Sequence, residues 1–262
     1  METIQYDLVD ETATITLTNP ALRNALTLEM ATEITEAVEE AESSDARCLV
    51  VQGSEANFCA GGDIKSMLEA LSDDREMAEL LQEVALPINR SVQRLYECSI
   101  PTVAKVDGPA FGAGASLALA CDVVLASERA QLSFGFRRIG LSVDSGTSFL
   151  LPRAVGEKKA MDLVYTGELI DAERAEELDL VSRVFPDDEF EQRCREIVET
   201  ITTGPTVALK QSKQLLQSGI NRSFDEAIDA ETDGLRAAFE SEDFETGVNA
   251  FINKETPEFD GE

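Results

Sequence analysis

Two short glycine-rich segments hold the residue types best suited to chemistry. They read FCAGGD at residues 58–63 and GPAFGAGAS at residues 108–116, and each is expected where a strand ends and a helix begins. Glycine lets the backbone adopt dihedral angles closed to other residues, and the first turn of a helix has N–H groups with no internal acceptor. Two such turns facing one point could stabilise an oxyanion, as is needed when a thioester carbonyl becomes an enolate.

The same glycines could also serve tight turns and close packing, or hold a nucleotide. A dinucleotide fingerprint GxGxxG that starts at Gly112 and Gly114 would need its third glycine at Leu117. The phosphate-binding pattern GxxxxGK[ST] does not occur in the sequence. The sequence therefore favours oxyanion stabilisation over nucleotide binding, and a purely structural role remains the alternative.

The chain contains no histidine, and this excludes several kinds of active site. Ser-His-Asp and Cys-His nucleophiles, histidine metal sites and an imidazole base all need that side chain. Proton transfer must therefore use a carboxylate, lysine, tyrosine or cysteine. The five cysteines are odd in number and form no CxxC pair, so we predict neither a disulfide framework nor a metal site.

The charge balance is strongly acidic. With 51 acidic and 22 basic residues the formal net charge is −29, which repels phosphate backbones and anionic membranes. We therefore predict no nucleic-acid partner and no membrane association. A high-salt cytoplasm would screen the self-repulsion. Because the sequence shows no leader at its start and no run of 18 apolar residues, we expect a soluble, cytoplasmic protein.

Hydrophobic periodicity predicts the elements that position the glycine segments. Alternating apolar residues over 4–17 predict a β-hairpin, steps of three or four from Thr27 predict an amphipathic helix, and Cys48 begins a buried strand that stops at Gly53. The pattern recurs with strands at 101–106, 122–126 and 130–134 and helices after Gly112 and Gly146. Repeated ββα units of this kind can stack as a spiral.

The remaining predicted elements are all helices. A long helix is predicted over 72–97, and beyond Pro186 only helices are expected, at 189–201, 206–218, 225–238 and 244–251. We predict an α/β fold with two regions, residues 1–190 as the spiral core with the site and residues 191–262 as a helical region. The apolar stripes of that helical region need a partner, which predicts oligomer contacts.

Several segments, in the same order, resemble the crotonase or enoyl-CoA hydratase/isomerase superfamily. They are RNAL at 23–26, FCAGGDIK at 58–65, VDGPAFGAGASLALACD at 106–122, IGLSVDSG at 139–146, LPRAVG at 151–156, AERA at 172–175 and FINK at 251–254. The resemblance covers nearly the whole chain. It implies a (ββα)n superhelix core, a C-terminal all-helical trimerisation region, a homotrimer or dimer of trimers, acyl-CoA thioester substrates, and no cofactor besides the CoA of the substrate.

The resemblance also implies roles for individual residues. The N–H groups of Gly62 and Ala113 are the implied oxyanion donors. The implied CoA-binding residues are Arg23, Ala25, Leu26, Ala60, Asp63, Ile64 and Lys65, with Lys254 and Phe259 reaching the CoA of a neighbouring subunit. Arg23 and Lys65 would form a local positive patch for the phosphates, or they are ordinary surface charges.

The chain departs from the classical hydratases of this family at two positions. Those enzymes place one glutamate in the helix after the second glycine segment and another about twenty residues later, and here the positions hold Ser116 and Phe136. Neither residue can act as a carboxylate acid or base, and Phe136 would line the substrate pocket with an apolar ring. Ordinary hydration is therefore not expected.

Asp144, in the segment LSVDSG, is the carboxylate that remains in a matching position. Relatives with an acidic residue here include enoyl-CoA isomerases, among them the epoxide isomerases of phenylacetate degradation. The resemblance therefore implies an isomerase in which Asp144 takes a proton from C2 and returns it to C4. The position is also that of the nucleophile in the family's aromatic dehalogenases, but those use histidine and tryptophan, which this chain lacks.

Three alternatives remain open from the sequence. Asp144 could simply cap a helix that begins near Ser145. The chain could be a hydratase that uses another carboxylate or an ordered water. It could also be a noncatalytic subunit that binds acyl-CoA and has lost both glutamates.

Overall fold

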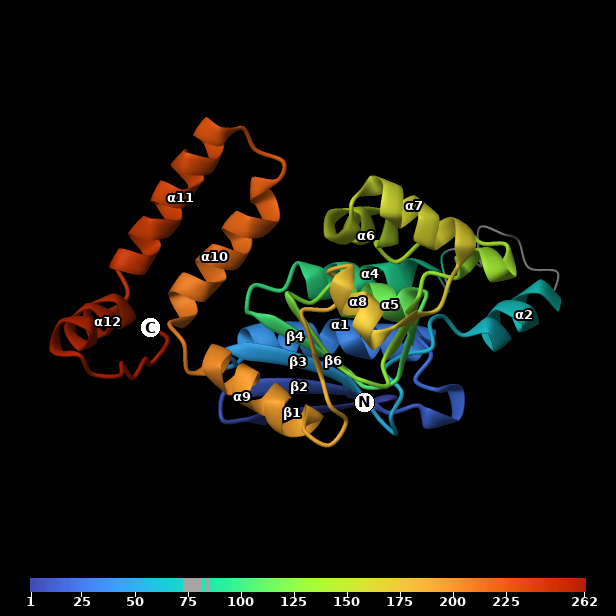
Figure 1. The fold of residues 1–262 in the computed structure, drawn as a ribbon. Coiled ribbons are helices and arrows are strands. Elements are labelled where there is room, and N and C mark those ends of the chain that lie inside the picture. The colour runs from blue at the N-terminus through green and yellow to red at the C-terminus, as the bar shows by residue number, and fades with distance from the viewer. Residues whose placement is uncertain (73–81, 83–84) are drawn as a thin grey trace.

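A central six-stranded sheet organises the chain, and the computed structural model describes residues 1–72, 82 and 85–262 (Figure 1). The strand order is β1-β2-β3-β4-β6-β9. Their bounds are Ile4–Val9 for β1, Thr12–Leu17 for β2, Cys48–Gly53 for β3, Thr102–Val106 for β4, Val123–Ser127 for β6 and Arg183–Phe185 for β9. β1 and β2 are antiparallel, and each later neighbour pairs in parallel. Parallel pairing requires crossover connections, and these hold the glycine segments.

The predicted hairpin over 4–17 is confirmed. Ala13, Ile15 and Leu17 of β2 are fully buried, as their alternation predicts. The turn residues Asp10 and Glu11 have φ of 47° and 59°, the left-handed conformation of tight turns that match the twist of paired strands.

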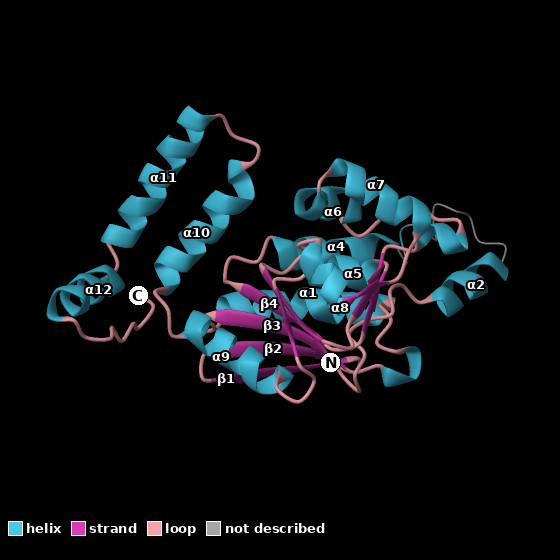
Figure 2. Ribbon diagram, in the orientation of Figure 1, coloured by secondary structure: helices cyan, strands magenta, loops and turns pink. Residues whose placement is uncertain are grey.

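A second, three-stranded sheet has the order β5-β7-β8 (Figure 2). Its strands are Pro109–Phe111 for β5, Gln131–Ser133 for β7 and Ile170–Asp171 for β8. β5 follows β4 and β7 follows β6 along the chain, so consecutive strands contribute to different sheets. The strands predicted at 101–106, 122–126 and 130–134 are β4, β6 and β7, whereas β5 lies inside the second glycine segment, where the sequence analysis predicts no strand.

Helices pack on both faces of the six-stranded sheet. α1, Leu28–Ser43, begins at its cap Thr27, whose hydroxyl accepts a hydrogen bond from the N–H of Met30 at 3.1 Å. One core includes Leu49 and Val51 of β3 with α1, and the other includes Cys48 and Val50 with α9. Neighbouring residues of a buried strand thus serve two different cores, which explains its unbroken apolar run.

Six further helices lie in the described part of the first 190 residues. They are α2 at Ile64–Ser72, α4 at Leu86–Tyr96, α5 at Ala113–Leu119, α6 at Thr147–Val155, α7 at Glu157–Thr166 and α8 at Ala172–Glu177, with short 3-10 turns at Pro20–Leu22 and Phe136–Ile139. Among them, α5 and α8 contact the small sheet. The last part of the helix predicted over 72–97 is α4. Most of its first half lies outside the described residues, so its full extent stays a prediction.

The C-terminal helices agree closely with the predicted ranges. They are α9 at Phe190–Thr202, α10 at Thr206–Gly219, α11 at Phe224–Phe239 and α12 at Glu242–Asn253, with the predicted break at Gly204 and Pro205. α10 and α11 form a hairpin that stands away from the sheets (Figure 1). It exposes large apolar side chains, among them Leu216, Ile220, Phe224 and Leu235. These surfaces suit a partner, while trimerisation and a domain boundary at residue 190 stay predictions.

Candidate active site

The two glycine-rich segments are hydrogen-bonded to each other. The N–H of Cys59 donates to the carbonyl of Pro109 and the N–H of Phe111 donates to the carbonyl of Cys59, both at 2.9 Å. Gly114, one turn later in α5, packs directly on this pairing, since a Cβ there would lie 2.3 Å from the Cys59 oxygen. The fold therefore brings together two turns that are about fifty residues apart in the sequence.

A methyl group at Gly114 is expected to disrupt this contact. Gly114→Ala would place its Cβ against the buried backbone of Cys59, so overpacking should lower the free energy of unfolding by about 1–3 kcal/mol or more. Gly219→Ala is the matched control, because nothing lies within 4 Å of a Cβ at that helical position. Urea unfolding of both variants measures the difference, and equal stabilities would contradict the close packing.

The backbone around Gly62 and Ala113 leaves two N–H groups without acceptors. The N–H of Leu26 donates to the carbonyl of Gly61 at 2.7 Å, and the N–H of Asp63 donates to the carbonyl of Leu26 at 3.2 Å. The N–H of Gly62, which lies between these two bonds, takes part in neither. Ala113 is the first residue of α5, where helical N–H groups have no internal partner. Within the described part of the chain, neither N–H donates a hydrogen bond. Both residues line the same cavity.

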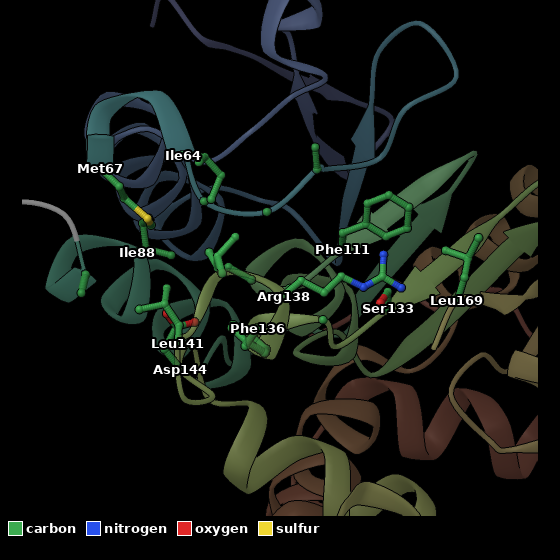
Figure 3. A pocket seen from close by; sticks show the side chains of 18 residues that line it. Ile64, Met67, Ile88, Phe111, Ser133, Phe136, Arg138, Leu141, Asp144 and Leu169 are labelled. Atoms are coloured by element: carbon green, nitrogen blue, oxygen red, sulfur yellow. The ribbon is translucent and has the colours of Figure 1, made fainter. Parts of the chain in front are cut away.

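This cavity has a volume of about 240 Å³ and a mostly apolar wall (Figure 3). Its lining residues are Ala60, Gly61, Gly62, Ile64, Met67, Ala85, Ile88, Phe111, Gly112, Ala113, Ser133, Gly135, Phe136, Arg138, Ile139, Leu141, Asp144 and Leu169. Asp144 is the single carboxylate among these described residues, and Arg138 is the single cation. An apolar cavity with a few convergent polar groups is the usual form of a small-molecule site.

A tight loop before α6 positions Asp144. Ser145 and Gly146 both have positive φ, 50° and 73°, and the N–H of Ser145 donates to Oδ1 of Asn89 on α4 at 2.8 Å. The hydroxyl of Ser145 donates to Oδ1 of Asp144 at 2.9 Å. In Figure 3 the Asp144 side chain lies close to Leu141 at one end of the cavity.

The helix-capping alternative for Asp144 is wrong. α6 has Gly146 as its cap residue and no capping side chain, and the N–H of Thr147 donates to the backbone carbonyl of Asp144 at 2.9 Å. The carboxylate of Asp144 therefore does not cap α6, and Asp144 lines the cavity. Burial raises the pKa of Asp144, and the hydrogen bond from Ser145 offsets part of that rise. A carboxylate with a raised pKa is a stronger base than an ordinary aspartate.

Ser116 and Phe136 occupy the two positions at which classical hydratases have glutamate. Ser116 is fully buried, and its Oγ lies 2.6 Å from Oγ1 of Thr147 in a hydroxyl–hydroxyl hydrogen bond. It does not line the cavity. Phe136 does line it and is 7% exposed, so this part of the wall is apolar as predicted.

The residues expected along the CoA path separate into two groups. Ala60 and Ile64 line the cavity. Ala25 and Leu26 are buried behind it, where Leu26 supports the turn at Gly62 through its backbone. Asp63 begins α2, since its carboxylate accepts the N–H of Lys65 at 3.0 Å.

The charged residues expected at the CoA phosphates lie outside the cavity wall. Arg23 and Lys65 are exposed, so contact with the phosphates of CoA stays a prediction. Lys254 ends α12, and the carbonyl of Phe259 accepts from Nη1 of Arg47 at 3.0 Å. Neither lines the cavity of its own chain, and their predicted reach to a neighbouring subunit is untested.

Two residues at the site have no predicted role in the sequence analysis. Asn89 holds the Asp144 loop from α4, and Arg138 lines the cavity. In the sequence Asn89 is one polar residue in a helical pattern, and Arg138 follows another arginine in what resembles a surface charge pair. Neither has a local signal that would distinguish it from a surface residue.

Two further observations concern the described residues. No group of three or more acidic or cysteine side chains there is arranged to hold a metal ion. None of the helices in that part of the chain is long and apolar enough to cross a membrane.

Comparisons with known proteins agree with this architecture. The family model described as enoyl-CoA hydratase/isomerase matches residues 9–262. A Rhodobacter capsulatus protein named "Probable enoyl-CoA hydratase" is 35% identical over 259 residues, covering 99% of this chain and 98% of the relative. The 1,2-epoxyphenylacetyl-CoA isomerase of Escherichia coli is 33% identical over 262 residues, covering 100% of this chain and 99% of the relative.

Solved structures show the same fold. The crystal structure of an enoyl-CoA hydratase/isomerase from Cupriavidus metallidurans matches with a TM-score of 0.91 and 32% identity, covering 100% of this chain and 97% of that one. The resemblance inferred from the glycine segments is thus confirmed over the full length, and the fold is the crotonase fold. This chain belongs to the enoyl-CoA hydratase/isomerase family.

Proposed function

We propose that this protein is an enoyl-CoA isomerase that moves a double bond from the 3 to the 2 position, with Asp144 as the proton carrier. The observation that carries the proposal is the combination at one cavity of a single carboxylate and two backbone N–H groups without acceptors, among the described residues. One base and one oxyanion site are what this isomerisation needs.

The reaction follows from these groups in two steps. The Asp144 carboxylate removes a proton from C2 of a 3-enoyl thioester, and the electron pair passes into the carbonyl to give a dienolate. The N–H groups of Gly62 and Ala113 bind the developing oxyanion. Asp144 then delivers the same proton to C4, which restores the carbonyl and leaves the double bond between C2 and C3.

The wall of the cavity argues against hydration. Adding water needs a group that activates the water and one that protonates C2, which the classical enzymes divide between two glutamates. Ser116 is buried in a hydrogen bond with Thr147, and Phe136 is apolar. No second carboxylate lines the cavity in the described part of the chain. The relatives bear both hydratase and isomerase names, so the proposal depends on these residues.

An assay with a panel of thioesters tests the proposal. The purified protein in high salt is expected to convert 3-hexenoyl-CoA to 2-hexenoyl-CoA and to leave crotonyl-CoA essentially unhydrated. 1,2-Epoxyphenylacetyl-CoA extends the panel to the substrate class of the Escherichia coli relative. Rapid hydration of crotonyl-CoA without isomerisation would overturn the proposal in favour of a hydratase. Tight binding of all esters without turnover would overturn it in favour of a noncatalytic subunit.

The raised pKa of Asp144 predicts a pH dependence. The base must be ionised, so kcat should fall as the pH drops through a midpoint above 3.8, the ordinary pKa of aspartate. Ser145→Ala removes the hydrogen bond that lowers this pKa, so it should move the midpoint further upward. Rate profiles of kcat against pH for both proteins measure the shift, and coincident or flat profiles would contradict it.

A further inference from the structure

Arg138 introduces a positive charge into the mostly apolar wall of the cavity. It comes from the 3-10 turn at Phe136–Ile139 and lines the same space as Gly62, Ala113 and Asp144. Figure 3 shows its side chain running away from Asp144, toward Ser133 and Leu169. The proposed isomerisation gives this cation no role.

The position of the Arg138 side chain is fixed by its neighbours. Its stem passes over Gly135, where a Cβ would lie 3.3 Å from Cδ and 3.4 Å from Nε of Arg138. Its Nη2 donates to the carbonyl of Gly167 at 2.6 Å, just beyond the end of α7. One contact at the stem and one at the guanidinium hold the group at the cavity without neutralising it.

Arg138 is exposed to solvent, and it has no ion-pair partner among the described residues. No carboxylate there lies within 4.0 Å of its nitrogen atoms, although the chain has 51 acidic residues. A guanidinium has five N–H donors in a planar fork, and the carbonyl of Gly167 is the one acceptor that they reach among the described residues. The remaining donors match the two oxygens of a carboxylate or of a phosphate.

We propose that Arg138 is a specificity residue that binds an anionic group on the acyl part of the substrate, so that the enzyme binds acyl-CoA esters bearing a carboxylate more tightly than apolar esters of the same length. The inference rests on the proposed acyl-CoA site. The shared ligand chemistry is an oxyanion, which the phosphates of CoA could also supply. Those phosphates are separated from the thioester by the whole pantetheine arm, whereas Arg138 lines the same cavity as the two N–H groups, which favours the acyl source.

Binding of saturated thioesters, which have no double bond for the enzyme to move, tests this inference without requiring turnover. Calorimetry would compare succinyl-, glutaryl- and adipoyl-CoA with butyryl-, pentanoyl- and hexanoyl-CoA, which have the same chain lengths and no acyl carboxylate. Arg138→Met is expected to weaken binding of at least one carboxylated ester by about tenfold or more and to leave the apolar esters unchanged. The affinity of Arg138→Lys for the carboxylated ester should lie between those of the parent and of Arg138→Met, because lysine keeps the charge and lacks the planar fork of donors.

Arg137→Met is the matched control. Arg137 is the preceding residue and is exposed, as Arg138 is. It donates in the same way to a carbonyl near the end of α7, that of Thr166 at 3.2 Å, but it does not line the cavity. Its replacement should change none of the affinities. Thermal unfolding of all variants separates a lost contact from a lost fold.

Pantetheine thioesters of the same acids distinguish the two sources of anion. They lack the phosphates of CoA. If Arg138→Met still weakens the binding of the carboxylated pantetheine esters selectively, the contact is assigned to the acyl carboxylate. An equal loss for all CoA esters that disappears with pantetheine esters would assign Arg138 to a phosphate and overturn the proposal. Unchanged affinities throughout would also overturn it. An absence of isomerase activity would affect none of these measurements.

Discussion

Asp144→Asn is expected to lower kcat for the isomerisation of 3-hexenoyl-CoA by about 10²–10⁴-fold, the usual contribution of a positioned acid or base. The amide has nearly the shape of the carboxylate but cannot accept the C2 proton. The affinity for the thioester should change little, because the apolar wall and the two backbone N–H groups stay in place. Steady-state kinetics and calorimetry with hexanoyl-CoA separate the two effects.

The stability of this variant provides an internal control. Burial raises the pKa of Asp144 in the folded state, so the ionised side chain costs stability as the pH rises through the unfolded and then the folded pKa. At neutral pH Asp144→Asn should therefore be at least as stable as the parent, and the difference should disappear below the unfolded pKa. Urea unfolding at several pH values measures this.

Asp229→Asn makes the same chemical change at an exposed position of α11, outside the cavity wall, and should leave kcat unchanged. An Asp144→Asn variant that keeps the parent rate would remove this carboxylate from the mechanism. A variant that loses activity together with its fold would contradict the predicted gain in stability.

Ala113→Pro is expected to lower kcat/KM by about 10²–10³-fold, the effect of removing one oxyanion donor. Proline has no N–H, so the substitution deletes the proposed donor itself. The first position of a helix tolerates proline well, because its N–H has no helical acceptor and the required φ is the one proline adopts. α5 should therefore form normally with proline at this position.

Ala113→Gly is the matched control, because it keeps the N–H and adds no atoms to the cavity. It should retain most of the activity, at a cost in stability of about 1 kcal/mol or less from the flexibility of glycine. Circular dichroism and thermal unfolding show whether both variants fold. Similar kcat/KM values for the parent and the Ala113→Pro variant would rule out this N–H as an oxyanion donor.

The elements of the fold could be predicted where the signal is local. The hairpin over 4–17 and helix α1 follow from apolar spacings of two and of three or four. The C-terminal helices begin and end within about two residues of their predicted bounds for the same reason. The family could be identified because several short segments, both glycine segments among them, match its pattern in the same order along the chain.

The amino-acid sequence by itself determined the elements of the fold, the family, and which residue types are available, above all the absence of histidine and the aspartate at residue 144. Only the tertiary structure decided how those residues are used. The bond from Ser145 to Asn89 spans 56 residues and the bond from Ser116 to Thr147 spans 31, so no local pattern contains either. The burial that raises the pKa of Asp144 and the cavity that exposes Arg138 arise for the same reason, because solvation and charge depend on which distant segments pack together.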